Sequence, residues 1–245
     1  MINTLRTYPL MMKWSFLYNK PWMVLRGVVQ IMTMAGFVIG ISFLFTDITP
    51  AIARHLITGT PTMILLMMGL VTVPQMVAYG RIQGTYDFML SLPVSRMVLL
   101  ASDASIYFLL TLPAITIAII IGSVYHDFTL QVSPLVVPAF ILISLTGSFI
   151  GYALALAVPH PRMAIIATQI LLLVIALFSP VIFPVDQLPA WMAAIHKVLP
   201  IKYMADLTRG TLTGLDFNVG LAFAATGAWC AVSFLFCYIV MKKRR

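Results

Sequence analysis

The chain has 245 residues, of which 61% are hydrophobic and only 9% are charged, and its mean hydropathy is +1.02. Soluble domains carry about 25% charged residues, so this composition excludes a soluble globular protein and indicates an integral membrane protein. The net charge of +8 comes from 15 lysines and arginines against seven aspartates. It does not indicate nucleic-acid binding, because the basic residues flank apolar runs, as is typical of membrane topology.

Residues 4–20 are too polar to span a membrane, and four basic residues precede the first long apolar run: Arg6, Lys13, Lys20 and Arg26. Arg6, Lys13 and Lys20 are spaced seven residues apart and would form one stripe along a helix, beside aromatic residues and methionines. Long basic side chains can keep their charges in water while their methylene groups lie in an apolar layer. The stretch therefore predicts a helix that lies at the membrane interface; a loosely ordered basic tail is the alternative.

Six apolar segments approach or exceed the ~20 residues that a membrane-spanning helix needs. They cover residues 27–45, 60–79, 97–122, 135–158, 163–184 and 219–241. No small-residue cleavage site follows the first segment, so we interpret it as a span and not as a signal peptide. The sequence thus predicts an all-α integral membrane protein with six transmembrane helices, in which residues 1–245 form a single transmembrane domain.

The basic residues set the expected orientation of the six spans. With a cytoplasmic N-terminus, eleven lysines and arginines lie inside, including those of the tail 242–245. Four lie outside, namely Arg54, Lys197, Lys202 and Arg209. Because cytoplasmic segments are enriched in lysine and arginine, we expect a multi-pass protein of the cell membrane with both termini in the cytoplasm.

Residues 84–96, GTYDFMLSLPVSR, form a partly polar stretch between the second and third spans. Gly84 permits a turn, and Thr85 can cap the free N–H groups of a following helix. Asp87 would lie in the first turn, where a negative charge suits the helix dipole. Pro93 disfavours helix at the residue before it. The pattern predicts a short cytoplasmic helix over residues 85–91.

The expected helix has one apolar face, because Tyr86, Met89 and Leu90 are spaced i, i+3 and i+4. Ser95 can cap the third span, with Arg96 at the membrane edge. Physical reasoning alone leaves two readings of this apolar face. It meets a partner protein, or it rests on lipid or on the chain's own bundle.

Polar residues within the spans are few. Gln30, Gln75 and Gln169 could each line a substrate path or make one hydrogen bond between helices. Asp103 could line a shared cavity or pair with a basic residue, and the sixteen methionines suit adaptable packing. Ion-coupled secondary transporters and channels usually carry ionisable residues at mid-membrane, and the spans here contain almost none; that class is kept as the alternative function.

Residues 179–210 interrupt the apolar pattern between the fifth and sixth spans. Pro180, Pro184, Pro189 and Pro200 break any long helix in this interval. We expect residues 185–218 to face outward and to carry short helices that partly re-enter the membrane.

Two motifs resemble those of type-2 (ABC-2) exporter permeases, the membrane subunits of ATP-binding-cassette transporters. The pattern Gly-Thr-x-Asp/Glu-x-x-Leu-x-x-Pro-Val-Ser of the family's coupling segment is carried by Gly84, Thr85, Asp87, Leu90, Pro93, Val94 and Ser95. The family's segment between the fifth and sixth spans is matched by Ser179, Pro180, Pro184, Leu188, Pro189, Trp191, Pro200, Arg209 and Gly210. The chain departs from the family by having Ile82 and Gln83 after Arg81, and Asp87 where glutamate is usual.

The resemblance implies a permease subunit that exports a hydrophobic or amphipathic substrate of drug, lipid or peptide type. Energy would come from a separate cytoplasmic ATPase subunit that binds ATP and Mg²⁺, since this chain has no G-x-x-x-x-G-K-[ST] phosphate-binding loop and is expected to bind no cofactor. The ATPase-coupling residues would be Gly84, Thr85, Tyr86, Asp87, Met89, Leu90, Pro93 and Arg96.

The family's working unit contains two permease chains and two ATPase chains. We therefore expect a dimer, homomeric or heteromeric, with spans one, two and five at the shared interface. Glycines that would permit close helix approach there are Gly27, Gly36, Gly40 and Gly69.

An enzyme is not expected, and neither is a metal site. Three-ligand metal sites are not suggested by the four histidines, which are predicted in loops or near interfaces: His55, His126, His160 and His196. A His-Glu-x-x-His motif is impossible without glutamate. The sequence leaves open the identity of the substrate and the choice between homodimer and heterodimer.

Overall fold

The computed structural model describes residues 4–43, 50–181, 185, 188–214 and 217–243, and every regular element within them is helical. The elements are α1 (Thr4–Ser42), α2 (Pro50–Met67), the π-helical turn η1 (Met68–Thr72), α3 (Val73–Ile82), α4 (Thr85–Ser91), α5 (Arg96–Tyr125), α6 (Val136–Ala157), α7 (Pro161–Phe178), α8 (Ala190–Val198), α9 (Pro200–Thr213) and α10 (Val219–Lys243). The predicted all-α class is confirmed.

Six helical stretches of the described chain are long and apolar enough to cross a membrane: Arg6–Gly40, Ile52–Ile82, Arg96–Tyr125, Val136–Ala157, Pro161–Phe178 and Val219–Lys242. The predicted number of spans is confirmed, and the fourth agrees closely with the expected 135–158. The second begins well before residue 60, because helical hydrogen bonding continues past the apolar core that hydropathy detects. The fifth span is α7, which ends at Phe178. Residues 182–184, which the sequence assigned to this span, lie outside the described residues.

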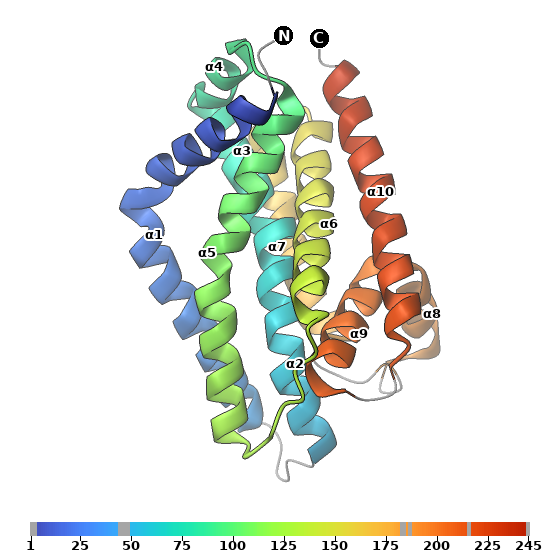
Figure 1. The fold of residues 1–245 in the computed structure, drawn as a ribbon. Helices are drawn as coiled ribbons and strands as arrows, with labels where there is room; N and C mark the ends of the chain where they lie inside the picture. Colours follow the sequence, from blue (N-terminus) through green and yellow to red (C-terminus); the bar gives the residue numbers. More distant parts are fainter. Residues whose placement is uncertain (1–3, 44–49, 182–184, 186–187, 215–216, 244–245) are drawn as a thin grey trace.

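The second span occupies the centre of the bundle. In its most apolar window, 83% of the residues are buried, against 12% for the first span and 17% each for the fifth and sixth. Figure 1 shows α1 on one side of α5 and α10 on the opposite side of the molecule, beside α6. The second span therefore forms the core, and α1, α7 and α10 present apolar side chains to the surroundings.

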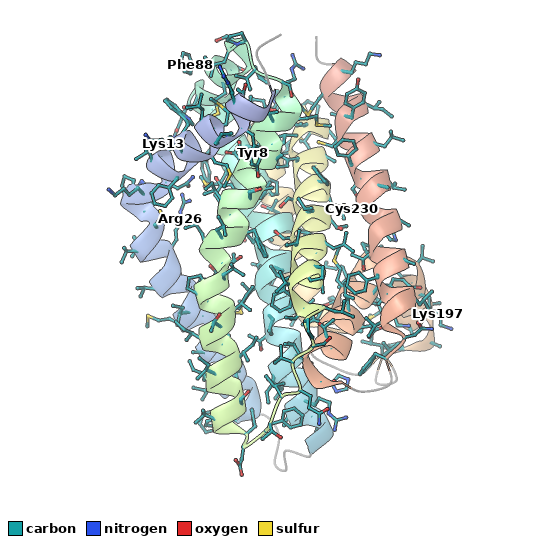
Figure 2. All side chains as sticks on the ribbon, in the orientation of Figure 1. Tyr8, Lys13, Arg26, Phe88, Lys197 and Cys230 are labelled. Atoms are coloured by element: carbon teal, nitrogen blue, oxygen red, sulfur yellow. The ribbon has the colours of Figure 1, made fainter. Side chains whose placement is uncertain are left out.

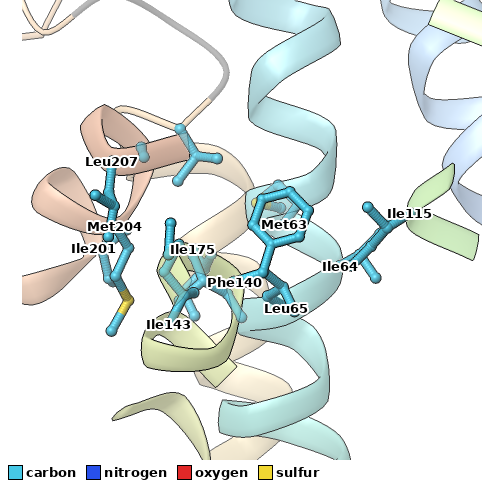
Figure 3. Packing of buried hydrophobic residues seen from close by; sticks show 14 of the residues in the cluster. Met63, Ile64, Leu65, Ile115, Phe140, Ile143, Ile175, Ile201, Met204 and Leu207 are labelled. Carbon is cyan, nitrogen blue, oxygen red and sulfur yellow. The ribbon is translucent and has the colours of Figure 1, made fainter. Parts of the chain in front are cut away.

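The main core lies where the second span meets α5, α6, α7 and α9 (Figure 3). Met63, Ile64 and Leu65 of α2 are almost completely buried against Ile143 of α6 and Met204 of α9, among other residues. This packing holds α9 inside the bundle, although α9 is too short and too polar to count as a span.

Three glycines bring the second span and α6 into backbone contact. A Cβ atom placed on Gly151 would lie 2.0 Å from the carbonyl oxygen of Gly69 and 2.9 Å from Cδ of Pro74. A Cβ on Gly69 would lie 2.5 Å from the carbonyl carbon of Gly147. Gly69 belongs to the π-helical turn η1, which directly precedes Pro74 in the first turn of α3. The expectation that Gly69 lies at a dimer interface is therefore wrong, since it is used within the chain.

The N-terminal stretch and the first span form one helix, α1, of 39 residues. The helix changes direction between Lys13 and Arg26 (Figures 1 and 2). Pro21 lies in this interval, and a proline inside a helix removes one backbone hydrogen bond and bends the axis. The expected interfacial helix is thus continuous with the first span, and its place at the membrane surface stays a prediction.

The two ends of the bundle differ. The chain termini and α4 lie together at one end, and α8 and α9 lie near the other (Figure 1). The expected short helices between the fifth and sixth spans are confirmed as α8 and α9, while their re-entry into the membrane stays a prediction. This arrangement separates the two sequence motifs along the axis of the bundle.

The chain after α7 is held by two basic side chains. Arg209 of α9 is buried, and its Nη2 donates hydrogen bonds to the carbonyl oxygens of Pro180 (3.1 Å) and Val181 (2.5 Å). Burial raises the pKa of the Asp206 carboxyl, which lies 3.4 Å from Arg209 Nη1, and the arginine opposes that shift. His196 of α8 lies 2.8 Å from the carbonyl oxygen of Phe178 through Nε2. These contacts fix the irregular backbone that follows Phe178.

Candidate functional site

The helix α4 is built by the turn chemistry at its two ends. Gly84 has φ 76°, a left-handed conformation that glycine adopts without steric cost, and it separates α3 from α4. The N–H of Phe88 donates to the carbonyl oxygen of Gly84. Leu92 is extended, as expected for a residue before Pro93, and the helix ends there. The predicted helix over 85–91 is confirmed.

The capping predictions had different outcomes. The N-cap position of α4 is Gly84, with no side-chain cap, so the prediction that Thr85 caps this helix is wrong. Asp87 lies in the first turn as predicted. Ser95 caps α5 as predicted, because its hydroxyl accepts a hydrogen bond of 3.2 Å from the N–H of Val98.

The two faces of α4 differ in exposure. Tyr86, Met89 and Leu90 point into the chain's own bundle, where they line a cavity of about 60 Å³. Asp87, Phe88 and Ser91 are exposed, and Phe88 is 56% accessible. Figure 2 shows Phe88 at the outer edge of the molecule. We call Asp87, Phe88 and Ser91 the outer face of α4. Of the two readings of the apolar face, the structure favours the second, since Tyr86, Met89 and Leu90 rest on the chain's own bundle; their contact with an ATPase stays a prediction.

Polar groups from three helices meet beside the inner face of α4. Asp103 of α5 and Tyr152 of α6 line the same cavity, and Asp103 accepts a hydrogen bond from the hydroxyl of Ser15 on α1. Asn19, one turn after Ser15, donates to the Ser15 carbonyl oxygen at 2.7 Å and accepts from Arg26 at 2.9 Å. The basic N-terminal part of α1 is therefore joined to the bundle directly beneath α4.

Two arginines flank α4 in sequence and bind the ends of other helices. Arg81, in the last turn of α3, donates to the carbonyl oxygens of Ala155, Val158 and Pro159. Arg96, the first residue of α5, donates to the carbonyl oxygen of Met241 at 2.6 Å. Arg96 was among the expected coupling residues, whereas Arg81 was not, although its position just before the turn is visible in the sequence.

The three glutamines lie in different surroundings. Gln30 lines a cavity of about 510 Å³ that lies between α1, the second span, α5 and α7, together with Met23, Met34 and Met67, among others. Gln75 donates to Thr168 Oγ1 at 3.1 Å and so joins α3 to α7. Gln169 is exposed on α7. The described contacts thus do not unite the three residues in one path.

Phe88 was missed among the candidate site residues, although the sequence holds a signal for it. If the apolar stripe of the helix faces the chain's own bundle, which was one of the two readings, Tyr86, Met89 and Leu90 lie on the inside. Phe88 then remains as the large apolar residue on the opposite side. This residue is 56% accessible, so Phe88 is the large apolar side chain that α4 presents outward.

Comparison with known proteins gives one family. Residues 10–213 match a family model described as ABC-2 type transporter. No curated protein matches the chain. The matched range covers the first five spans, α4 and the segment that contains α8 and α9.

Proposed function

Because the chain belongs to the ABC-2 type transporter family, we propose that it is the permease subunit of an ATP-driven exporter that is powered by a separate ATPase. The family identifies the chain as the permease component of an ABC transporter and as a multi-pass membrane protein. The proposed cargo is a hydrophobic or amphipathic molecule that leaves the cytoplasm. ATP and Mg²⁺ would bind to the ATPase subunit.

The observation that carries this proposal is the division of α4 into an anchored and an exposed face. The inner residues Tyr86, Met89 and Leu90 fix the helix on the bundle, and the outer residues Asp87 and Phe88 remain free for a partner surface. An exposed phenylalanine on a helix suits a helix-in-groove contact. In this proposal Gly84 and Thr85 set the start of the coupling helix, while Pro93 and Arg96 set the direction in which the chain leaves it.

The membrane orientation is part of the same proposal. In the predicted topology, eleven of the fifteen lysines and arginines lie on the same side of the membrane as α4 and the two termini. An ATPase in the cytoplasm reaches α4 only if this end is cytoplasmic. Binding of the ATPase through α4 therefore tests the orientation as well as the partner.

We expect Phe88→Ala to weaken binding of the ATPase about 30-fold, the equivalent of ~2 kcal/mol for a truncated interface anchor. The folded permease should keep its melting temperature, because Phe88 is exposed. Co-purification of the ATPase with the tagged permease is the measurement.

Val124→Ala is the matched control, since Val124 is 77% exposed at the C-terminal end of α5, away from α4. Leu90→Ala should instead lower the melting temperature. Wild-type retention of the ATPase by Phe88→Ala would refute the proposal.

A cavity supports the proposed class of substrate. The space of about 510 Å³ beside Gln30 is bordered mainly by apolar residues, including Met67, Met68 and Leu110, and by the polar residues Asn19 and Arg26. Flexible methionine side chains adapt to apolar molecules of different shape. This composition suits an amphipathic molecule better than a strongly polar one.

We also propose that two permease chains pair through α1 and α7. Gly36 and Gly40 have open space where a Cβ would lie, and Gln169 is a polar residue exposed on α7. The second span is largely buried in its own bundle, so it can supply only a small part of this interface.

A cysteine at Gly36 should therefore form an intermolecular disulfide on mild oxidation in native membranes. A cysteine at Val232, which is 59% exposed on α10, is the control and should give none. Because Cys230 and Cys237 could react, both would first be replaced by alanine. Equal cross-linking at both positions, or none at Gly36, would refute pairing through α1.

A further inference from the structure

Arg81 binds the end of α6. Its Nη1 lies 2.9 Å from the carbonyl oxygen of Ala155 and 3.1 Å from that of Val158, and its Nη2 lies 2.8 Å from that of Pro159. Since α6 ends at Ala157, these carbonyls belong to its last turn and to the chain directly after it. The last carbonyls of a helix have no partners within the helix, and one guanidinium provides donors for one of them and for the two carbonyls that follow the helix.

Arg96 makes the corresponding contact at the end of α10. Its Nη1 lies 2.6 Å from the carbonyl oxygen of Met241, and α10 ends at Lys243. A positive charge at the C-terminus of a helix also interacts favourably with the helix dipole. Both arginines thus hold the C-terminal ends of helices that are distant from them in sequence.

The two contacts lie on either side of α4. Arg81 is three residues before Gly84, and Arg96 is five residues after Ser91. Both arginines line one cavity of about 150 Å³ together with Tyr86, Asp87 and Leu90 of α4. The other residues of this cavity are Leu156 of α6 and Met241 of α10. The helix α4, both arginines and both bound helices therefore meet in one place, with Asp87 of the outer face at its edge.

We propose that Arg81 and Arg96 are positioning residues that tie α4 separately to the ends of α6 and α10. A displacement of α4 then carries these two helices with it. This inference rests on the proposed function of α4 as the ATPase-coupling helix. Arginine suits the task because its planar fork directs several N–H groups in fixed directions, which a lysine ammonium does not.

The simpler explanation of both arginines is that they are basic residues at the cytoplasmic edge of a span, with no role in linking helices. Arg162, an exposed residue in the first turn of α7, has that character. Arg81 and Arg96 differ from it because they are partly buried and donate to backbone carbonyls more than 70 residues away in sequence. Arg162 is therefore the matched control.

The test measures distances between spin labels on the full chain in lipid nanodiscs, without an ATPase. Labels at Ser91 and His160 report on α4 and the end of α6, and labels at Ser91 and Lys242 report on α4 and the end of α10; all three sites are exposed. Cys230 and Cys237 are replaced by alanine in every sample.

We expect Arg81→Gln to broaden the 91–160 distance distribution at least twofold and to leave the 91–242 distribution unchanged. Arg96→Gln should do the reverse, and Arg162→Gln should change neither. Arg81→Lys and Arg96→Lys keep the charge but lose the planar guanidinium. Arg81→Lys should broaden the 91–160 distribution, and Arg96→Lys the 91–242 distribution, less than the corresponding glutamine variant does. A general loss of packing would broaden both pairs together. That result, or no change in either pair, would overturn the inference, and the lysine variants give the same decision if a glutamine variant does not fold.

A second measurement uses the complex with the ATPase, in which Asp87 and Phe88 remain intact. Because Ser91 lies on the outer face of α4, ATPase binding by the labelled chain is first compared with binding by the unlabelled chain, and only the unlabelled chain tests the proposed function. The wild-type 91–242 distance should be the same in the nucleotide-free and vanadate-trapped complexes, and in Arg96→Gln it should differ between them. An equal distance in both states of Arg96→Gln would overturn the inference. Failure of the wild-type chain to bind any ATPase would contradict the proposed function instead, and the nanodisc measurement would still decide on the two links.

Discussion

Replacing Gly151 with alanine is expected to destabilise the folded chain by about 3 kcal/mol, at the upper end of the usual cost of overpacking. The melting temperature should fall by about 6–12 °C. This is a large effect for the addition of one methyl group. In an unhindered helix, the same change is favourable by up to ~1 kcal/mol, since alanine has the higher helix propensity.

The cause is the nature of the atoms that the new methyl group would meet. The nearest are the carbonyl oxygen of Gly69 at 2.0 Å and Cδ of Pro74 at 2.9 Å. A side chain could rotate away from the methyl group, but a backbone carbonyl and a proline ring cannot. Relief therefore requires α6 to move away from the central span, which separates helices that carry the main core.

Gly227→Ala on α10 is the matched control, because no atom lies within 4 Å of the position that its Cβ would take. It should leave the melting temperature unchanged or raise it slightly. Thermal unfolding of both purified variants in detergent, followed by size-exclusion chromatography, measures the difference. An equal melting temperature for the two variants would show that the backbones of the second span and α6 are not in contact.

Replacing Arg209 with methionine is expected to destabilise the chain by about 3–5 kcal/mol, the usual cost of removing one partner of a buried charged pair. Methionine fills much of the same volume but has no donor. The carbonyl oxygens of Pro180 and Val181 would lose their partner, and Asp206 would lose the cation beside it. Most expressed protein should then fail to give a monodisperse peak.

The position of these carbonyls explains why the loss is large. The helix α7 ends at Phe178, and irregular backbone follows it. Non-helical backbone in a membrane protein is tolerated where protein groups satisfy its hydrogen bonds. Arg209 performs this task from α9, and His196 of α8 contacts the carbonyl oxygen of Phe178, the last residue of α7.

Two variants serve as controls for Arg209→Met. Lys202→Met removes a positive charge from the same helix at a partly exposed position and should cost less than ~1 kcal/mol. Arg209→Lys keeps the charge but not the fork and should fall between the two. The melting temperatures decide the order. If Lys202→Met and Arg209→Met were equally stable, the hydrogen bonds of Arg209 would contribute nothing to the fold.

The sequence predicts the helical class, the number of spans and the helix at α4 because each depends on local signals. Apolar runs of sufficient length mark spans, and Gly84 and Pro93 mark the limits of a short helix. The starts of the longer helices are predicted less well. Arg54 and His55 reduce the hydropathy of the first turns of α2 without interrupting its hydrogen bonding. The continuous α1 was missed for a similar reason, since Pro21 bends a helix without ending it.

Contacts between distant segments could not be predicted from the sequence alone. Nothing local indicates that Asp103 is bound by Ser15, or that Arg81 reaches the end of α6. The direction of the apolar face of α4 was open for the same reason. Tyr86, Met89 and Leu90 suit a partner groove as well as the chain's own bundle, and only the packing of α3, α5 and α6 decides between them.

The π-helical turn at residues 68–72 affects the C-terminal end of the second span, where Arg81 lies. A π turn contains about one residue more than an α turn, and one residue corresponds to a rotation of ~100° about the helix axis. The direction in which Arg81 points is therefore set by the extra residue in η1 and not by α3 alone. Deleting one residue from this turn would leave the composition of the span almost unchanged, but it would rotate Arg81 and the start of α4 by about a quarter of a circle relative to α2.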